Sequence, residues 1–391
     1  MPIPPLGKPR LPSNYYVWFE PPDDSGDEVL HFVSGRRRLK VKGHSFREFV
    51  KRVAPLLDGR RSWSEIQEQV ADVFRPEDLA ECLELLAQHD ILEDASEDPE
   101  SGISRRIEPQ LNLFRELGNS SAAAQKKLAE ATVAVVGLGG CGAAAALSLA
   151  SAGVGTLKLV DALPVRETDV YFTPALPLAA VGASRAAAVA VIVAGAAPQV
   201  KVRTCDSRLD SEADIRAAVQ DSSFVVCCLD AGQANLVFKL NRVCLELAQP
   251  WTNCALDGTE VILGPTVHPG KGPCYLCYRM RAIACAANPE DAFELERELD
   301  RRKQDDGCRR ENLVFSAGAA GNLIGLEVLK ELTGIAAPSL VGQIAVFDML
   351  DLAVTKHVVL RKPWCPACYG RRGEERTGAV GKAAGAGVAN D

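Results

Sequence analysis

The sequence of 391 residues predicts an α/β protein built on a doubly wound, Rossmann-like and mostly parallel sheet, with a small second domain at the N-terminus. Two observations lead to this prediction. Short β-branched runs such as VAVVG, LKLVD and VKVRTC alternate with Ala-rich segments of helical length, which is the pattern of parallel βαβ units. Ahead of them, residues 28–94 hold two short strand-like runs and then three amphipathic segments, which favours a separate small domain.

Composition divides the chain into five segments. Residues 1–27 are rich in Pro and polar residues, and we expect a flexible N-terminus there. Residues 28–94 form the small domain, and residues 95–105, ASEDPESGISR, read as a linker. Residues 106–370 form the sheet domain. Residues 371–391 are a low-complexity tail that we expect to be disordered.

The small domain begins with a predicted hairpin. EVLHFV and RRLKV read as two strands that turn at Ser34-Gly35. A first helix is expected over HSFREFVKRVAPLL, where apolar residues recur at helical spacing. A capping box formed by Ser62 and Glu65 opens a second helix, and Pro76 lies in the first turn of a third.

A glycine-rich turn marks the start of the sheet domain. In VAVVGLGGCG a strand runs directly into Gly137, Gly139, Gly140 and Gly142, and a small-residue helix follows. Such glycines allow a tight turn, bring backbone amides close to a phosphate and let helix and strand pack closely. The helix N-terminus attracts the anion, and Asp161, at the end of the next strand, is placed to accept hydrogen bonds from ribose hydroxyls. These five residues predict a nucleotide site, but the motif alone does not choose NAD from ATP.

Two CxxC pairs lie far apart in the sequence. GPCYLCYR contains Cys274 and Cys277, and KPWCPACYG contains Cys365 and Cys368. Two such pairs supply the four thiolates of a tetrahedral zinc site, and four protein ligands leave no open position for catalysis. We therefore predict a structural zinc, with redox-active or simply buried thiols as the alternative.

Composition argues against several classes of protein. A net charge of −7 is unfavourable for a general nucleic-acid binder. No run reaches 18 apolar residues, so we expect no membrane span. The chain holds thirteen cysteines and its N-terminus shows no apolar signal segment. Reduced thiols and metal ligands are then expected, in a cytoplasmic protein.

The glycine loop, Asp161, the CLDAG segment around Asp230 and the two CxxC pairs together resemble the ThiF/MoeB superfamily, the ubiquitin-activating-enzyme-like adenylating proteins. The resemblance covers about residues 106–369. It implies that the nucleotide is ATP, that Asp161 contacts the ribose and that Asp230 is associated with Mg²⁺. It also implies adenylation of a protein or peptide C-terminus, with Asp230 and Arg185 as candidate catalytic residues, and we expect a homodimer.

Several positions depart from that family's pattern. Where the family reads Ser-Asn-Leu-x-Arg-Gln, this chain has TDVYFT, which places Asp169 at the Asn and Phe172 at the Arg. That Arg helps to neutralise the triphosphate, and Phe172 cannot. Arg185 matches the family's following Lys, which keeps the charge but not the geometry. The family's Arg-Gln before the sheet falls near Pro109-Gln110, where Arg106 is a weak substitute. These changes indicate an eroded ATP site.

Residues 28–94 resemble a RiPP recognition element, the PqqD-like winged-helix module to which a leader peptide adds as a strand. Residues 36–52 contain eight Lys or Arg and one acid, Glu48, and a basic strand edge suits an acidic leader. A plain winged helix and a nucleic-acid binder are the alternatives. The predicted peptide-binding residues are Arg36, Arg37, Arg38, Lys40, Lys42 and Arg47.

A chain that combines these two modules resembles the leader-binding partner proteins of thiazole/oxazole-modified peptide pathways. In those pathways a separate YcaO-type enzyme cyclodehydrates the peptide. The main hypothesis is therefore a non-catalytic or catalytically weak receptor that binds a precursor's leader and presents it to such an enzyme. The alternative is an ATP-dependent enzyme that adenylates a carboxylate or side chain of a ribosomal peptide. An NAD-dependent oxidoreductase is a weaker alternative. Cys308, in DDGCRREN, is a candidate nucleophile, although chance placement is favoured.

Overall fold

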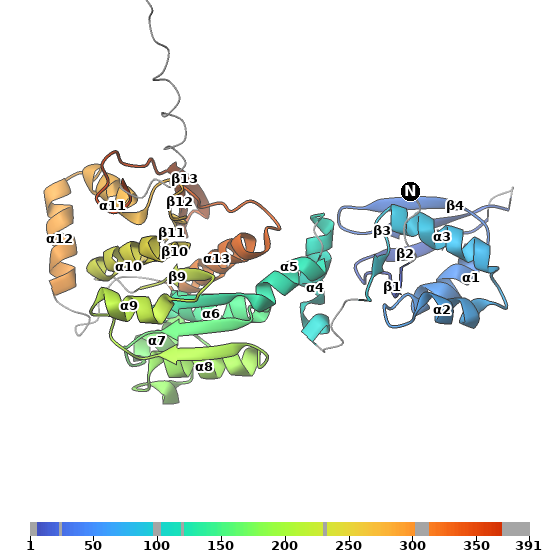
Figure 1. The fold of residues 1–391 in the computed structure, drawn as a ribbon, viewed down its shortest axis with the longest axis horizontal. Coiled ribbons are helices and arrows are strands. Elements are labelled where there is room, and N and C mark those ends of the chain that lie inside the picture. Colours follow the sequence, from blue (N-terminus) through green and yellow to red (C-terminus); the bar gives the residue numbers. More distant parts are fainter. Residues whose placement is uncertain are drawn as a thin grey trace, which may run out of the picture. The chain divides into compact units, whose positions relative to one another are not determined.

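The computed structural model describes residues 6–22, 26–96, 103–118, 121–229, 233–301 and 313–369. The chain forms two compact units, Met1–Gln125 and Lys126–Asp391. Figure 1 labels most of the helices and strands of both units.

The first unit contains a three-stranded antiparallel sheet in the order β2–β3–β4 (Figure 1). Alternate side chains of the central strand, Leu30 and Phe32, are fully buried in the unit's hydrophobic core. A second sheet has two antiparallel strands, which pair Pro9 with Asp94 and Arg10 with Glu93. The strands are β1 (Pro9–Arg10), β2 (Tyr16–Glu20), β3 (Glu28–Val33), β4 (Arg38–Gly43) and β5 (Glu93–Asp94).

The structure differs from the expected flexible N-terminus at β2. The stretch YVWFE pairs with β3 along its whole length, from Tyr16 opposite Val33 to Glu20 opposite Val29. Aromatic and β-branched residues fit a pleated, half-buried surface, so this short run forms an edge strand although Pro-rich segments flank it. The predicted hairpin of the next two strands, turning after Val33, is confirmed.

Helices cover one face of this small sheet. The first predicted helix is present but changes geometry along its length, and Pro55 lies in its last turn, where the missing N–H removes an α-helical hydrogen bond. The capping box is confirmed, because Glu65 accepts from the N–H of Ser62 at 2.7 Å and Ser62 Oγ accepts from the N–H of Glu65. The helical segments are α1 (Phe46–Glu48), η1 (Phe49–Val53), η2 (Ala54–Leu56), α2 (Trp63–Val70) and α3 (Pro76–Gln88).

Helix α4 (Ile103–Glu116) belongs with this first unit. Arg115, near its end, forms an ion pair with Glu93. Glu116 accepts hydrogen bonds from the side-chain amide of Asn14 at 2.7 Å and from the N–H of Arg36 at 3.1 Å. The sequence predicts that the sheet domain starts at residue 106, and in the structure α4 contacts the small sheet. Helix α5 (Ser121–Glu130) follows.

The second unit is built on an eight-stranded sheet in the order β13–β12–β11–β10–β9–β6–β7–β8. The five strands from β8 to β10 are parallel, and the three at the other end are antiparallel. The predicted fold class, an α/β protein with a mostly parallel sheet, is confirmed. The strands are β6 (Thr132–Val136), β7 (Thr156–Val160), β8 (Lys201–Cys205), β9 (Phe224–Cys227), β10 (Trp251–Asp257), β11 (Glu260–Leu263), β12 (Gln343–Asp348) and β13 (Ala353–Val358).

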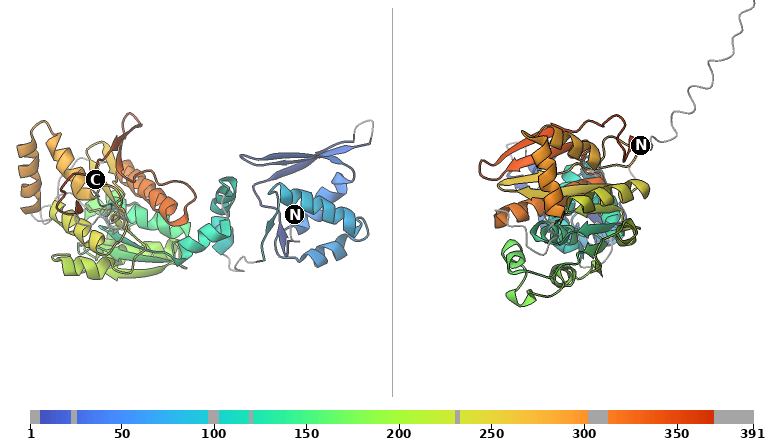
Figure 2. Two further views of the ribbon diagram at one scale, coloured as in Figure 1. Left: turned by 45° about the horizontal axis from the view of Figure 1, so that its top comes forward. Right: turned by 90° about the vertical axis from the view of Figure 1, so that its left-hand side faces the viewer.

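Helices lie on both faces of this sheet (Figure 2). Right-handed crossovers place α6 and α8 on one face and α9 and α10 on the other, and α13 packs beside α6. Gly321 of α13 permits that contact, since a Cβ there would lie 2.5 Å from the carbonyl oxygen of Cys141. The helical segments are α6 (Gly140–Ala152), α7 (Glu167–Phe172), η3 (Leu178–Ala180), α8 (Arg185–Ala196), α9 (Glu212–Val219), α10 (Ala234–Glu246), α11 (Tyr275–Ala284), α12 (Pro289–Arg301) and α13 (Val314–Thr333).

The chain order reverses at β6, and this positions the candidate site. β7 and β8 extend the sheet on one side of β6, whereas β9 and β10 extend it on the other. Ligands of open α/β sheets bind outside the carboxyl ends of the strands at such a switch point. Among the described residues, no helix is long and apolar enough to cross a membrane.

Candidate functional sites

The glycine loop at the end of β6 depends on the absence of side chains. Gly137 has a φ of 88°, and a Cβ there would lie 2.5 Å from the carbonyl oxygen of Cys228. A Cβ on Gly142 would lie 1.9 Å from the carbonyl oxygen of Gly137, so the first turn of α6 packs directly on the loop. Gly139 is the N-cap of α6. The close helix–strand packing expected from the motif is therefore present.

A cavity of about 370 Å³ lies at the carboxyl ends of these strands. Its size is within the ordinary range of small-molecule sites, roughly 300–1,000 Å³. It lies at the switch point, and Gly137 and Asp161 are among the residues that line it. Other lining residues come from the segment after β8 and from α10, including Arg208, Asp210 and Lys239.

Asp161 fastens the glycine loop to the loop after β7. One carboxylate oxygen accepts from the N–H of Leu138 at 2.8 Å, and the other accepts from the N–H of Leu163 at 2.8 Å. The oxygen that accepts from Leu138 also lies 3.4 Å from Nη1 of Arg185, and the residue lines the cavity. Its position therefore suits the predicted ribose contact, while its hydrogen bonds give it a structural role without any ligand.

Arg185 is held away from the cavity. Its guanidinium donates to both carboxylate oxygens of Asp169, from Nε at 2.8 Å and from Nη2 at 2.7 Å. Nη1 lies 3.4 Å from Asp161, and only 3% of the Arg185 side chain is exposed. Arg185 is not among the residues that line the cavity. Arg185 is therefore a buried partner of Asp169 in this structure, and its role as a catalytic cation stays a prediction.

Phe172 lies against the start of α6. A Cβ on Gly140 would be 2.7 Å from Cβ of Phe172, so the aromatic residue adjoins the helix N-terminus near which the resemblance places a phosphate-binding Arg. Gln110 donates to Gln125 at 2.9 Å, within the first unit, and Arg106 is exposed on α4. Asp230 and Cys308 lie outside the described residues, so their predicted roles remain predictions.

Two cations at the cavity were missed by the sequence analysis. Lys239 donates to the carbonyl oxygen of Asp210 at 2.6 Å, and Arg208 lies 3.9 Å from the Asp210 carboxylate. Asp300 also lines the cavity and accepts from the N–H of Asn235 at 3.0 Å, and burial raises its pKa. The sequence could have indicated both residues by their places in the chain, because Arg208 follows β8 and Lys239 lies within the helix that follows β9.

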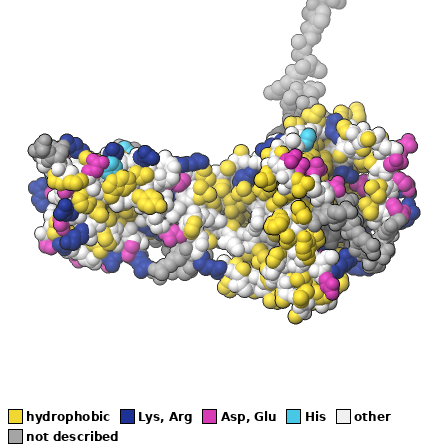
Figure 3. All heavy atoms as spheres, turned by 180° about the vertical axis from the view of Figure 1, so that it is seen from behind, with side chains coloured by type: hydrophobic (Ala, Val, Ile, Leu, Met, Phe, Trp, Pro, Cys, Tyr) yellow, Lys and Arg dark blue, Asp and Glu magenta, His cyan; other side chains and the backbone are white. Residues whose placement is uncertain are grey.

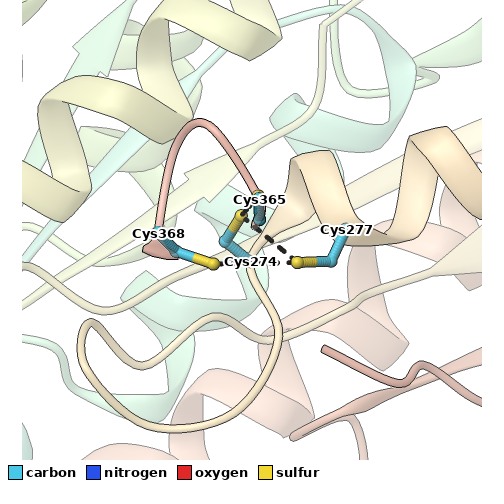
Figure 4. Close-up of side chains that lie close together, drawn as sticks. All are labelled: Cys274, Cys277, Cys365 and Cys368. Atoms are coloured by element: carbon cyan, nitrogen blue, oxygen red, sulfur yellow. Dashed lines mark hydrogen bonds between the residues drawn. The ribbon is translucent and has the colours of Figure 1, made fainter. Parts of the chain in front are cut away.

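The four predicted metal ligands come together. Their sulfur atoms all lie within 4.8 Å of one another, and all four residues are buried (Figure 4). Cys274 caps the N-terminus of α11, Cys277 lies in its first turn, and the other pair lies in a turn near residue 365. The Sγ–Sγ distances are 3.7 Å from Cys274 to Cys365, 3.7 Å from Cys277 to Cys368 and 3.9 Å within the first pair.

These distances fit zinc. Zn–S bonds of about 2.3 Å in a tetrahedron place the sulfurs about 3.8 Å apart. The N–H of Lys362 donates to Sγ of Cys277 at 3.4 Å. The pKa of Cys277 is lowered, chiefly by the hydrogen bond from Cys274, whereas the pKa of Cys274 is raised, chiefly by the same hydrogen bond, and that of Cys368 is raised by burial. Donor set, spacing and burial therefore suit a structural Zn²⁺ held by all four cysteines.

The predicted peptide-binding residues do not share one surface. Arg37 lies near Asp90, with Nη1 3.3 Å from its carboxylate, and this contact ties the β3–β4 turn to the end of α3. Arg47 stacks over the ring of Phe19 at 5.4 Å. Arg36 lies in the turn and is exposed. The remaining three alternate along β4 and are exposed on one face of the sheet: Arg38, Lys40 and Lys42.

Comparisons with known proteins agree on the second unit. The model of the ThiF family matches residues 108–367. Protein HesA of Nostoc sp. (strain PCC 7120) is 31% identical over 255 residues, which cover 64% of this chain and 90% of that protein. The sulfur carrier protein ThiS adenylyltransferase of Escherichia coli (strain K12) is 28% identical over 256 residues, which cover 63% and 89%.

Solved structures extend the likeness to the first unit. A crystal structure of E. coli MccB with ATP has a TM-score of 0.61 at 18% identity and covers 92% of this chain and 99% of that chain. The microcin C7 biosynthetic enzyme MccB in complex with N-formylated MccA gives a TM-score of 0.63 at 18% identity, with the same coverage. At this identity the likeness establishes a shared fold.

Proposed function

This chain belongs to the ThiF family, and on that basis we propose that it is an ATP-dependent enzyme that adenylates a ribosomal precursor peptide. The observation that supports this most is the cavity at Gly137 and Asp161, which lies where an α/β sheet binds its ligand and has two cations, Arg208 and Lys239, on its wall. A curated relative is named an adenylyltransferase, and a structural neighbour is described with ATP. These comparisons favour adenylation over the receptor hypothesis.

The proposed reaction begins with ATP in the cavity. A carboxylate oxygen of the peptide attacks the α-phosphorus, the bond from that phosphorus to the bridging oxygen of the β-phosphate breaks, and pyrophosphate leaves. The products are a peptidyl adenylate and pyrophosphate. Backbone N–H groups at the start of α6 would hold phosphate oxygens, and Lys239 and Arg208 would neutralise charge that Arg185 cannot reach.

The first unit would bind the peptide. Its antiparallel sheet carries Arg38, Lys40 and Lys42 on one exposed strand, which suits an acidic leader. Its strands and helices are compatible with the PqqD-like module that the sequence resembles. MccB, whose fold covers both units, is described in complex with N-formylated MccA, and this also supports a peptide substrate here.

A second candidate function is favoured by the pair formed by Arg185 and Asp169. Their bidentate bond removes a cation from ATP chemistry, and Phe172 replaces another. A protein that binds the leader and presents it to a partner such as a YcaO-type cyclodehydratase, without using ATP, would need neither cation. The nicotinamide oxidoreductase alternative gains no support from the comparisons.

ATP–pyrophosphate exchange separates the two candidates. The full chain, with Mg²⁺ and a precursor peptide encoded beside its gene, is expected to exchange labelled pyrophosphate into ATP at a rate of the order of one per second, the lower end of ordinary enzyme turnover. Lys239→Met should reduce that rate, whereas Lys201→Met, an exposed change on β8, should not. Peptide binding without exchange would replace adenylation by the receptor function.

A further inference from the structure

The outer face of the small sheet, which we define as the side chains of β2, β3 and β4 that point away from the core, combines aromatic and basic residues. Strand pairing aligns them in rows across the sheet, with Trp18 opposite His31 and His31 opposite Lys40. The neighbouring row runs from Tyr16 to Arg38. Figure 3 shows hydrophobic side chains gathered on this unit with Lys and Arg around them.

Two aromatic side chains on this face are open to solvent. Tyr16 is 74% exposed and Trp18 is 44% exposed, although aromatic residues are usually mostly buried. Trp18 stacks flat on His31, with ring centroids 4.7 Å apart and an interplanar angle of 3°. His31 in turn bonds Glu20 at 2.8 Å and is itself buried. These contacts fix one face of the Trp18 ring and leave the other side available to a partner.

The basic strand beside these aromatics is incompletely neutralised. Lys42 pairs with Asp27 at 3.0 Å. For Arg38 and Lys40, by contrast, the described part of the chain provides no carboxylate within ion-pairing distance. Both side chains are exposed, so the outer face presents two cations next to two aromatic rings.

We propose that the outer face binds an acidic segment of the precursor peptide that also carries an apolar or aromatic side chain. This inference rests on the proposed function and deepens it, because it adds a contact surface distinct from strand addition at the sheet edge. The apolar side chain would pack on Trp18 and Tyr16, where a pre-ordered ring loses little conformational entropy. The peptide's carboxylates would lie over Arg38 and Lys40.

Charge complementarity selects this occupant. A neutral or basic segment would leave the two cations unpaired beneath it, at a cost in desolvation. The chain's own C-terminal residues 370–391 contain four basic and three acidic residues, so they do not complement the face. A second copy of this chain is the competing occupant, and the experiment distinguishes it.

The test uses the full chain and two labelled synthetic peptides, one rich in Glu and Leu and one with each Glu replaced by Gln, beside the labelled precursor. Fluorescence anisotropy should show that Trp18→Ala and Lys40→Glu each weaken binding of the precursor and of the Glu-rich peptide by at least about fivefold. Trp18→Phe should retain most of the affinity. Lys51→Glu, the same charge change on η1, should have little effect. The Gln peptide should bind more weakly and with less salt dependence.

The possible outcomes distinguish a failure of the outer-face proposal from a failure of the proposed function. If the precursor binds and neither variant changes its affinity, the outer face is not the contact surface, although the proposed function stands. If the wild-type chain binds no peptide, both fail. If Trp18 emission changes with protein concentration alone, and not with peptide, a second copy covers this face and the proposal is overturned. Circular dichroism of both variants confirms that any loss is not unfolding.

Discussion

Arg185 donates two hydrogen bonds to Asp169, at 2.8 Å from Nε and 2.7 Å from Nη2, and both side chains are buried. The resemblance to adenylating proteins places an Asn and a Lys at these two positions. Here the two residues satisfy each other, and Asp161 completes the group at 3.4 Å from Arg185. The two departures from the family pattern are therefore one coupled structural change.

We predict that Arg185→Ala destabilises the second unit by about 3–5 kcal/mol, because the Asp169 carboxylate would remain buried without its partner. Arg185→Lys should cost less, since it keeps the charge but loses the bidentate geometry. Urea unfolding followed by circular dichroism measures both. Arg216→Ala, at a partly exposed pair with Glu246, is the matched control and should cost at most about 1 kcal/mol. Equal losses at the two sites would contradict the assignment.

We predict one equivalent of zinc per chain, held by the cluster of four buried cysteines. Metal analysis of protein purified without added zinc should find it, and Cys365→Ser should lower the content. Because structural zinc binding is coupled to folding, chelation should lower the melting temperature. Cys285→Ser, at an exposed cysteine outside the cluster, is the control. A zinc content near zero in the wild type, or one unchanged by Cys365→Ser, would end this hypothesis.

We predict that Asp94 stabilises the first unit in a pH-dependent manner. Burial alone would raise its pKa, but hydrogen bonds from the Ser96 hydroxyl and from the N–H groups of Lys8 and Gly7 lower the pKa to about 2. A lowered folded-state pKa gives stability that is present above about pH 4, the ordinary Asp value, and that is lost as the pH falls towards 2. Asp94→Ala should therefore lower the urea midpoint at pH 7 but have little effect near pH 2.

Urea titrations at several pH values check this expectation, with Glu68→Ala on the exposed side of α2 as the control. A loss of midpoint that is the same at pH 7 and near pH 2 would show that Asp94 acts through packing rather than through its charge.

We predict a homodimer that uses the exposed edge strand β13. Val354 and Val358 lie on the same side of this strand and are 51% and 74% exposed, and the preceding turn exposes Leu352. Exposed apolar side chains along an edge strand favour a protein interface, and on that side of β13 Lys356 lies between the two valines. Light scattering should find a dimer for the wild type and a monomer when both valines are changed to Lys. Val191→Lys, at an exposed position on α8, should remain dimeric, and a wild-type monomer would refute the prediction.

The sequence predicts the parts of this protein that depend on local pattern. The roles of Gly137 and Gly142 can be predicted from the motif, because only glycine permits the tight turn and the close packing of helix on strand. The CxxC spacing predicts the cluster because two short loops must each supply two ligands. Ser62 and Glu65 form their capping box from residues three apart.

Contacts between residues that are distant in the chain could not be predicted from the sequence. The bidentate bond of Arg185 joins residues sixteen positions apart, and nothing in either local motif indicates it. Lys239 reaches the cavity only because α10 follows β9 at the switch point. The basic stretch from Arg36 to Arg47 looked like one surface, but strand alternation and the turn direct its members to different neighbours.

The most direct test of adenylation is transfer of the α-phosphate label of ATP to the precursor peptide. The full-length protein, ATP labelled at the α-phosphate, Mg²⁺ and the precursor are mixed, and the peptide is separated and counted. Adenylation predicts labelled peptide from the wild type and much less from Lys239→Met, which removes a cation from the cavity wall. Absence of label from a wild-type protein that binds the same peptide would contradict adenylation and leave leader presentation as the function.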